Sequence, residues 1–279
     1  MKRKIIKFIV QEKFNNIAII DYFNSYHINK SIINDAINNK VLFVNGKIIK
    51  DNMFLLYSND VIEIGIKYED VQPYNYNIDV IYEDEYIIAV NKPKNILVHT
   101  DGNTNQTLTN AVCSYLRQKD KMPYAYPIHR LDYETTGIVV FAKNKVVLSF
   151  LSVEIEKHNV LKKYVCLCYG KFSKKEGFIN KAISSDRHSN KQIVCKNGKE
   201  ALTTYKVIKN DDISKVEVII KHGRKHQIRV HLNSLNHPLV GDSLYGIEDG
   251  QSLKLHFKYI SFTHPYTREQ IIIESKEDF

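Results

Sequence analysis

The chain has 279 residues, 43% of them hydrophobic and 25% charged, which is the balance of a globular protein large enough for one large domain and a small one. Its net charge is +9, and residues 157–225 alone hold 17 Lys and Arg against 6 Asp and Glu. This local excess favours a polyanionic partner such as RNA, although a solvated lysine-rich surface would give the same count. Four cysteines without zinc-like spacing indicate reduced thiols.

The start of the chain gives no targeting or membrane signal. Met1-Lys-Arg-Lys is basic, but the apolar run over residues 5–10 is short and is interrupted by Lys7. It lacks a secretory core and a small-residue cleavage site. No run of the sequence approaches the apolar length of a membrane helix. We therefore expect a cytoplasmic protein that does not enter a membrane.

Residues 1–72 are predicted to form a small α/β domain. Apolar residues recur at roughly helical spacing over residues 23–37. Residues 41–64 then contain strands, two of which flank Asn45-Gly46, the strongest short hairpin signal because both residues tolerate positive φ. Residues 69–73 are typical of a linker, since Pro73 cannot continue a helix and biases its neighbour towards extended geometry.

Residues 73–279 are predicted to form a second, larger domain of the α+β class. An acidic turn separates two apolar strands at its start, and helices follow before a series of strands. The pattern predicts a mixed, largely antiparallel sheet with peripheral helices. The expected elements are a hairpin over 78–92, helices over 107–117 and 146–158, and strands over 164–167, 201–207, 216–220, 254–262 and 270–273.

One segment joins polar side chains of chemical interest to a strand that the pattern predicts to be buried. It runs His129-Arg130-Leu131-Asp132-Tyr133-Glu134-Thr135-Thr136-Gly137 and continues directly into Ile138-Val139-Val140-Phe141. Catalytic groups usually sit on loops held by such rigid strands, which makes Asp132 a candidate catalytic carboxylate. A turn whose Asp and Thr side chains bond their own backbone would give the same pattern.

Two further segments carry candidate partners for that carboxylate. Gly223-Arg224-Lys225-His226-Gln227-Ile228-Arg229-Val230-His231-Leu232 follows a predicted strand, and a helix is expected from His226 onwards. It offers the cations that a carboxylate in an apolar pocket requires, since desolvation alone would raise a carboxyl pKa. The other segment is Lys162-Lys163-Tyr164-Val165-Cys166, within a predicted strand.

Together these segments resemble the RluA class of pseudouridine synthases, which isomerise uridine to pseudouridine within RNA. The segment around Asp132 is similar to the catalytic motif of that class, with Thr136 where Ser is usual. The block from Gly223 to His231 matches the class pattern Gly-Arg-x-His-Gln-hydrophobic-Arg-x-His at every named position. The strand around Tyr164 resembles Lys-x-Tyr-x-Ala, with Cys166 where Ala is common. The resemblance covers residues 78–273 in five ordered blocks.

The resemblance implies roles for individual residues. Asp132 is the essential carboxylate, Tyr164 the active-site tyrosine, and Arg224 the cation that pairs with Asp132. Substrate contacts are expected of Arg130, which would fill the place of a flipped uridine, of Ile228, which would pack against the uracil, and of His129, Gln227 and Arg229. For Arg130 a surface pair with Glu134 remains an alternative, and for Arg229 a contact with solvent or backbone phosphates.

The implied reaction needs no redox change, phosphate or metal, so we expect no cofactor and no metal site. The bond between N1 of uracil and the sugar breaks, the base turns, and a carbon–carbon bond forms at C5. One ionised carboxylate can serve, either by covalent attack or by stabilising an intermediate and moving a proton. The sequence leaves these routes open.

The N-terminal segment resembles the alpha-L RNA-binding module that precedes many enzymes of this class. Its helix, strand, Val-Asn-Gly and strand are in order, but the basic residues of the second helix are reduced to Lys30 and Lys40. With this module the expected substrate is large-subunit ribosomal RNA, with transfer RNA as the other candidate. We expect the enzyme to act as a monomer.

Three other functions would use some of the same residues. A metal hydrolase would use His226, His231, His237 and Asp242, but these His spacings do not place ligands on one helical face. A kinase interpretation of the His129 to Asp132 motif fails because Leu131 intrudes and no Gly-rich loop precedes it. A non-catalytic RNA-binding or ribosome-assembly protein on the same fold remains the principal alternative, against which the intact Asp132 argues.

Overall fold

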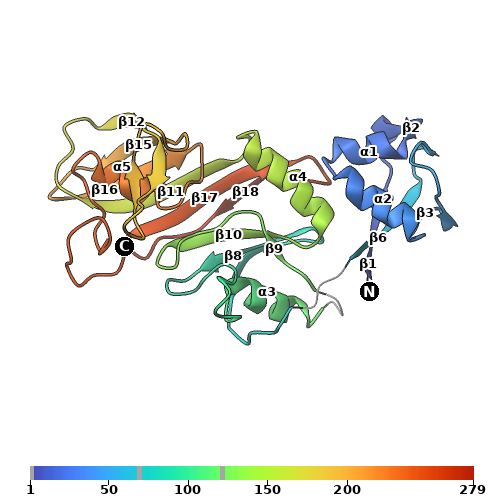
Figure 1. Cartoon of the computed structure of the whole chain (residues 1–279), viewed down its shortest axis with the longest axis horizontal. Helices are drawn as coiled ribbons and strands as arrows, with labels where there is room; N and C mark the ends of the chain where they lie inside the picture. The colour runs from blue at the N-terminus through green and yellow to red at the C-terminus, as the bar shows by residue number, and fades with distance from the viewer. Residues whose placement is uncertain (1–2, 68–70, 120–122) are drawn as a thin grey trace.

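The computed structural model describes residues 3–67, 71–119 and 123–279. These residues build two separate hydrophobic clusters, a smaller one within residues 6–66 that Val146 joins and a larger one within residues 87–273. The smaller cluster belongs to the N-terminal unit at the right of Figure 1, and the larger belongs to the sheet-rich unit at the left. Of the chain described here, no helix is both long and apolar enough to span a bilayer.

The N-terminal unit packs two short helices against a four-stranded antiparallel sheet. The Asn45-Gly46 turn joins two of its strands with φ values of 49° and 77°, so the predicted hairpin is confirmed. The helically spaced residues 23–37 belong to two helices, because His27 between them takes a positive φ of 55°. The helices are α1 (Ile19–Ser25) and α2 (Lys30–Asn38), the sheet order is β1 (Arg3–Ile9), β6 (Val61–Lys67), β3 (Leu42–Val44) and β4 (Lys47–Ile48), and β2 (Ile17–Ala18) pairs with β5 (Leu55–Leu56).

The larger unit is built on one ten-stranded sheet, and the predicted mixed, largely antiparallel architecture is confirmed. Among the described strands, only β10 and β17 pair in parallel, over Thr136 with His256 and Gly137 with Phe257. The path through the sheet is β12 (Glu176–Asn180), β15 (Leu202–Lys209), β16 (Ile213–Ile220), β11 (Leu161–Tyr169), β17 (Leu255–Thr263), β10 (Thr136–Ala142), β8 (Ile87–Lys92) and β7 (Asp79–Glu83), with β18 (Gln270–Glu274) beside β17 and β9 (Tyr126–Pro127) beside β10.

Gly137 is required at that parallel junction. It has a φ of +113°, and a Cβ on it would lie 2.4 Å from the backbone oxygen of Phe257. Only glycine combines this backbone angle with so close an approach of a neighbouring strand. The segment that carries Asp132 therefore enters the centre of the sheet at a fixed point.

Three helices accompany the sheet, and each begins where its sequence provides a cap or a turn. Thr107 accepts from the backbone N–H of Asn110 at the start of α3 (Leu108–Leu116), and Asn144 accepts from Val147 at the start of α4 (Lys145–Glu156). The third, α5 (Gln227–Asn233), follows His226, whose φ is 54°. The helices expected over 107–117 and 146–158 are thus confirmed.

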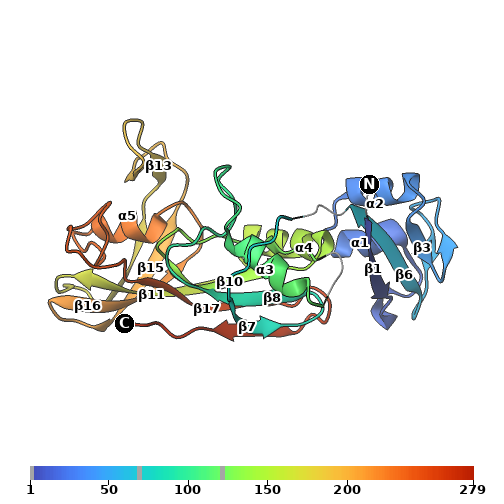
Figure 2. The same ribbon diagram turned by 90° about the horizontal axis from the view of Figure 1, so that it is seen from below.

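The predicted strands after residue 160 are present as β11, β15, β16, β17 and β18. The sequence did not predict β1, β12, or the hairpin of β13 (Ile183–Ser185) and β14 (Gln192–Val194), which projects from the sheet in Figure 2. The hairpin strands are only three residues long and mostly exposed, so they lack the buried alternation that marks a strand in sequence.

The two units contact each other through the turn between β17 and β18. Tyr266 stacks on Tyr86 with centroids 4.8 Å apart and also contacts Phe8 of β1. Arg268 places its guanidinium 4.5 Å from the ring of Tyr26 and 4.4 Å from that of Phe150. Cation–π contacts from both units thus hold one arginine between them.

Candidate active site

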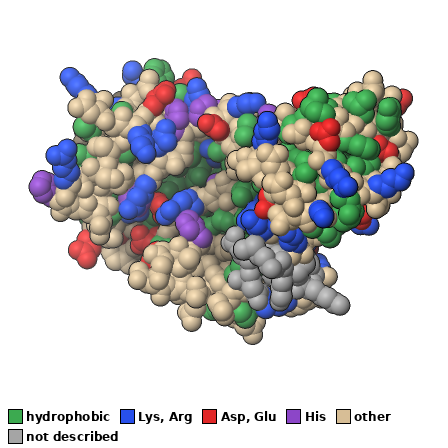
Figure 3. Space-filling model, turned by 45° about the vertical axis from the view of Figure 1, so that its right-hand side comes forward, with side chains coloured by type: hydrophobic (Ala, Val, Ile, Leu, Met, Phe, Trp, Pro, Cys, Tyr) green, Lys and Arg blue, Asp and Glu red, His purple; other side chains and the backbone are tan. Residues whose placement is uncertain are grey.

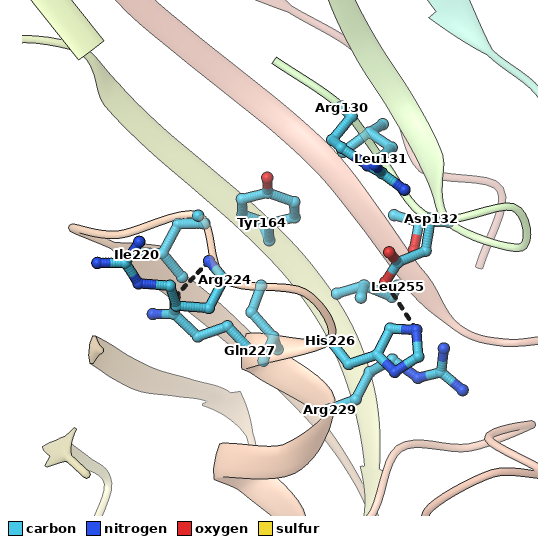
Figure 4. Close-up of a pocket in the computed structure, with 13 residues that line it drawn as sticks. Arg130, Leu131, Asp132, Tyr164, Ile220, Arg224, His226, Gln227, Arg229 and Leu255 are labelled. Carbon is cyan, nitrogen blue, oxygen red and sulfur yellow. Dashed lines mark hydrogen bonds and ion pairs between the residues drawn. The ribbon is translucent and has the colours of Figure 1, made fainter. Parts of the chain in front are cut away.

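A small pocket lies where the Asp132 loop, β11 and the start of α5 meet (Figure 4). Its volume is about 70 Å³. Asp132, Tyr164 and Ile228 come from three segments that are far apart in sequence, and all of them line it. Figure 3 shows Lys, Arg and His side chains gathered around a hollow on this face of the molecule.

The loop that presents Asp132 is held by a buried lysine that the sequence analysis did not single out. Lys92, only 1% exposed at the end of β8, donates from Nζ to the carbonyl oxygens of Pro93, Tyr133 and Thr135, at 2.9, 3.0 and 2.7 Å. Desolvation lowers the pKa of Lys92 to about 7, and the negative charge of Asp132 opposes that shift. One ammonium group therefore ties the backbone directly after Asp132 to the end of β8.

A histidine lies beside the carboxylate of Asp132. Nε2 of His226 lies 3.9 Å from Oδ2 of Asp132, and the His226 side chain is 10% exposed against 23% for Asp132. Burial lowers the pKa of His226, while the charge of Asp132 raises it. His226 occupies this place because its left-handed backbone conformation turns the chain into α5.

Arg224 does not pair with Asp132 in this structure, contrary to the expectation. Its Nε donates to the carbonyl oxygen of Glu200 at 2.9 Å, and in Figure 4 its guanidinium points away from Asp132. Arg229, inside α5, is the arginine whose pKa the negative charge of Asp132 helps to raise. The physical reason is the turn at His226, after which Arg229 faces Asp132 while Arg224, before the turn, faces the opposite wall.

Arg229 is buried, so the phosphate or solvent contact considered for it is wrong. Its Nε and a terminal nitrogen donate to the two carboxylate oxygens of Asp242 at 2.8 and 2.6 Å. Arg229 is 3% exposed and Asp242 is fully buried, and Glu134 lies 3.9 Å from the same guanidinium. A buried bidentate pair of this kind fixes the direction of the guanidinium.

Tyr164 and Ile228 line the pocket as expected. Tyr164 stacks on Phe257 with ring centroids 4.4 Å apart and planes 11° apart. Burial and the charge of Asp132 raise the pKa of Tyr164, so its hydroxyl keeps its proton at neutral pH. Ile228, 4% exposed, adds an apolar wall. The two side chains form a flat, apolar surface beside a carboxylate.

The other residues expected to contact substrate lie in different environments. Arg130 is exposed at the rim of the pocket, and within the described residues its guanidinium makes no ion pair, with Glu134 or any other carboxylate. His129 lies outside the pocket lining, and its Nε2 accepts from the backbone N–H of Val140, so the substrate contact expected of it stays a prediction. Desolvation lowers the pKa of His129 to about 3, which keeps its ring neutral.

Gln227 lines the pocket, but its amide is used within the protein. Its Nε2 donates to the carbonyl oxygen of Leu202 and to Oγ1 of Thr203, both at 3.0 Å, and its Oε1 accepts from the backbone N–H of Arg224 at 3.1 Å. Gln227 therefore attaches α5 to β15, and its polar atoms are not free for an RNA contact.

The residues considered for a metal site have separate partners. His231 contacts Thr203, His237 contacts the carbonyl oxygen of Tyr169, and Asp242 binds Arg229. Across residues 3–67, 71–119 and 123–279, no three His, Cys, Asp or Glu side chains lie close enough together to hold a metal ion.

Four residues that build the site, Lys92, His226, Asp242 and Tyr245, whose hydroxyl contacts His226, were not predicted to belong to it. Lys92 stands in a Lys-Pro pair after a buried strand, and Asp242 and Tyr245 in a loop taken as structural. A lysine within an otherwise apolar strand is the one local signal that could have drawn attention to Lys92, because lysine is almost never fully buried without a partner.

The pocket thus combines one carboxylate, one buried tyrosine and an apolar wall with arginines around them, at the centre of a mixed sheet. The model of the RNA pseudouridylate synthase family matches residues 86–234. The chain belongs to this family, which confirms the resemblance, and it is an RNA pseudouridine synthase.

Relatives agree with this assignment, and a solved structure shares the fold. The chain is 34% identical to an uncharacterised RNA pseudouridine synthase of Bacillus subtilis over 88% of its own length and 84% of that protein. It is 35% identical to the ribosomal large subunit pseudouridine synthase D of Buchnera aphidicola, covering 78% and 70% of the two chains. The structure of human RNA pseudouridylate synthase domain containing 1 shares the fold, with a TM-score of 0.61 at 24% identity over 74% of this chain and 86% of that one.

Proposed function

We propose that this enzyme isomerises specific uridines of structured RNA, large-subunit ribosomal RNA first among them, with Asp132 as the essential carboxylate. The observation that carries the proposal is the pocket in which Asp132 faces Tyr164 and Ile228. Relatives named as ribosomal large subunit pseudouridine synthase D favour ribosomal over transfer RNA.

The proposed chemistry follows from the groups that surround the carboxylate of Asp132 and the ring of Tyr164. Asp132 acts on the uridine as an ionised carboxylate, with the positive charge of Arg229 and the imidazole of His226 on one side and Lys92 on the other. The flat uracil packs on Tyr164 and against Ile228. Because the hydroxyl of Tyr164 keeps its proton, the ionised carboxylate of Asp132 is the group in the pocket that can take the proton from C5, and N1 of the product gains one in its place. No step of this chemistry requires a metal or a cofactor.

A uridine inside a stacked helix cannot reach this pocket unless it is flipped out. Arg130 is placed for that event, since its guanidinium is exposed at the rim and holds no ion pair with any described carboxylate. A planar guanidinium can stack between bases in the space that the uridine leaves. Arg224, directed at Glu200, remains available to the RNA strand that runs out of the pocket.

We further propose that residues 1–72 form an alpha-L type RNA-binding domain and residues 73–279 the catalytic domain. The support is the separate hydrophobic cluster of the N-terminal unit and its hairpin at Asn45-Gly46. The enzyme is expected to act as a monomer in the cytoplasm.

The test is pseudouridine mapping of total RNA from cells with and without the gene. Discrete sites should disappear in the deletion and return with the wild-type gene but not with Asp132→Asn. Asp212→Asn is the matched control, because the side chain of Asp212 is 98% exposed and outside the pocket lining. Restoration by Asp132→Asn would refute the role of Asp132. RNA binding by the wild type without product would favour the non-catalytic alternative.

A further inference from the structure

Tyr245 links the projecting hairpin to the carboxylate site through its hydroxyl group. Its hydroxyl oxygen accepts from the backbone N–H of Gln192 at 2.6 Å and lies 2.8 Å from Nδ1 of His226. Gln192 begins β14 of the projecting hairpin, and His226 faces Asp132 at 3.9 Å through its other ring nitrogen. A continuous path of polar contacts therefore runs from the hairpin to the carboxylate.

Hydrogen-bond accounting assigns the protons along this path. A phenol has one proton to donate, and burial raises the pKa of Tyr245, so that proton is present at neutral pH. Of the two described partners of this hydroxyl, the backbone N–H of Gln192 can only donate, so Nδ1 of His226 is the acceptor within reach of the phenolic proton. A neutral imidazole that accepts at Nδ1 carries its hydrogen on Nε2, the atom directed at Asp132.

Contacts with Asp242, Arg229 and His226 hold Tyr245 in place. Its backbone N–H donates to Oδ1 of Asp242 at 3.1 Å, and the guanidinium of Arg229 lies 5.2 Å from its ring centroid. The ring also meets that of His226 edge to face, with centroids 5.5 Å apart. Side chains held from three sides can transmit a small displacement of one neighbour to another.

The hairpin lies beside a groove suited to the RNA strand next to the target uridine. The groove has a volume of about 500 Å³ and is lined by β13, β14 and the segment before α5. Lys199, Arg224 and Lys225 contribute three positive charges to it, and Lys199 and Lys225 are exposed. Cationic side chains in a groove contiguous with the pocket fit the phosphates of a polynucleotide.

We propose that Tyr245 is a positioning residue: it holds His226 with Nε2–H towards Asp132 and makes that arrangement depend on the hairpin that borders the RNA strand. The inference rests on the proposed role of Asp132. It implies that RNA seated in the groove sets the His226 to Asp132 distance, so that the carboxylate is poised only when the flanking strand is in place.

The experiment uses the full-length enzyme and total RNA from cells that lack the gene. For each variant, the single-turnover rate at saturating enzyme and the enzyme concentration that gives half the maximal rate are measured at the mapped sites. Tyr245→Phe keeps the ring and loses one hydroxyl, so we expect the rate to fall about 3- to 10-fold, the effect of one hydrogen bond, while the half-saturating concentration changes less than about twofold.

A second variant, His226→Gln, tests whether Tyr245 affects the rate through His226 or only by supporting the local structure. Its amide can place an N–H where Nε2–H lies and has no tautomer to be selected. We therefore expect Tyr245→Phe to change the rate less than about twofold when it is added to His226→Gln. His226→Asn, whose shorter side chain does not reach Asp132, should not restore the rate that His226→Gln retains.

The possible results distinguish a failure of this inference from a failure of the proposed function. An undiminished Tyr245→Phe enzyme, or an equal loss in both His226 backgrounds, overturns the inference. Activity in Asp132→Asn overturns the role of Asp132 instead. Melting temperatures of the variants identify any that fail to fold. If Tyr245→Phe does not fold, the comparison of the two His226 variants decides: a rate for His226→Gln no higher than that for His226→Asn overturns the inference.

Discussion

Replacing Lys92 by methionine tests what holds the Asp132 loop. Methionine fills nearly the same volume, so the change is concentrated in the three hydrogen bonds from Nζ to the carbonyl oxygens of Pro93, Tyr133 and Thr135. Each bond from a charged donor contributes about 1.5–3 kcal/mol, which gives about 5–9 kcal/mol for the three. The substitution removes all of this.

An opposing effect comes from the desolvated ammonium. The pKa of Lys92 falls from 10.5 to about 7, and a shift of about 3.5 units corresponds to roughly 5 kcal/mol against the charged form. Methionine relieves that cost. Hydrogen bonding exceeds it, and we expect Lys92→Met to lower the free energy of unfolding at pH 7 by about 2 kcal/mol, measured by urea denaturation.

The pH dependence gives the same reasoning a second check. Because the folded-state pKa of Lys92 is depressed, the unfolded chain binds more protons between pH 7 and 10.5. The stability of the wild type should therefore rise through this window relative to Lys92→Met, in which the titrating group is absent. A variant as stable as the wild type at pH 7, with a difference that stays flat up to pH 10, would refute the account.

Other predictions concern single sites. Asp242→Ala leaves the buried guanidinium of Arg229 unpaired and should cost about 3–5 kcal/mol in urea denaturation, and Asp242→Asn should cost less. Gly137→Ala forces a Cβ to 2.4 Å from a backbone oxygen of β17 at a φ of +113°, so it should cost more than about 3 kcal/mol or prevent soluble expression. Burial raises the pKa of Asp84, but hydrogen bonds from His264 and neighbouring groups outweigh burial and lower that pKa to about 2. About 2 kcal/mol of stability that is present above pH 4 should therefore be lost as the pH falls towards 2. In acid denaturation, Asp84→Asn should make the free energy of unfolding depend less steeply on pH over this range.

The motif and most of the sheet could be predicted because their signals are local. The run from Ile138 to Phe141 is fully buried in the centre of the sheet, and Asn45-Gly46 adopts the backbone angles that its residue types favour. Thr136 keeps the hydroxyl that the class carries on Ser, and its Oγ1 lies 2.8 Å from Nδ1 of His256. Such features depend on a few neighbouring residues, which a sequence shows directly.

The choice between Arg224 and Arg229 could not be made from sequence. Both belong to one ten-residue block, and which of them faces Asp132 depends on the residue where the helix starts. His226 takes a left-handed conformation, and α5 begins only at Gln227, so the two arginines lie on opposite sides of a turn. A sequence pattern places a helix boundary only to within a few residues, and here one residue changes the direction of a guanidinium.

The position of the pocket follows from the one parallel pairing of the described sheet. β10 and β17 are matched at only two positions, Thr136 with His256 and Gly137 with Phe257, so the strands meet closely and then separate. Asp132 lies in the loop just before this junction, and Leu255, at the start of β17, lines the same pocket. Tyr164 pairs with Phe257 from the next strand, which brings its ring to the same point. The junction thus joins two antiparallel halves, and the opening between them is where a base can meet groups from both.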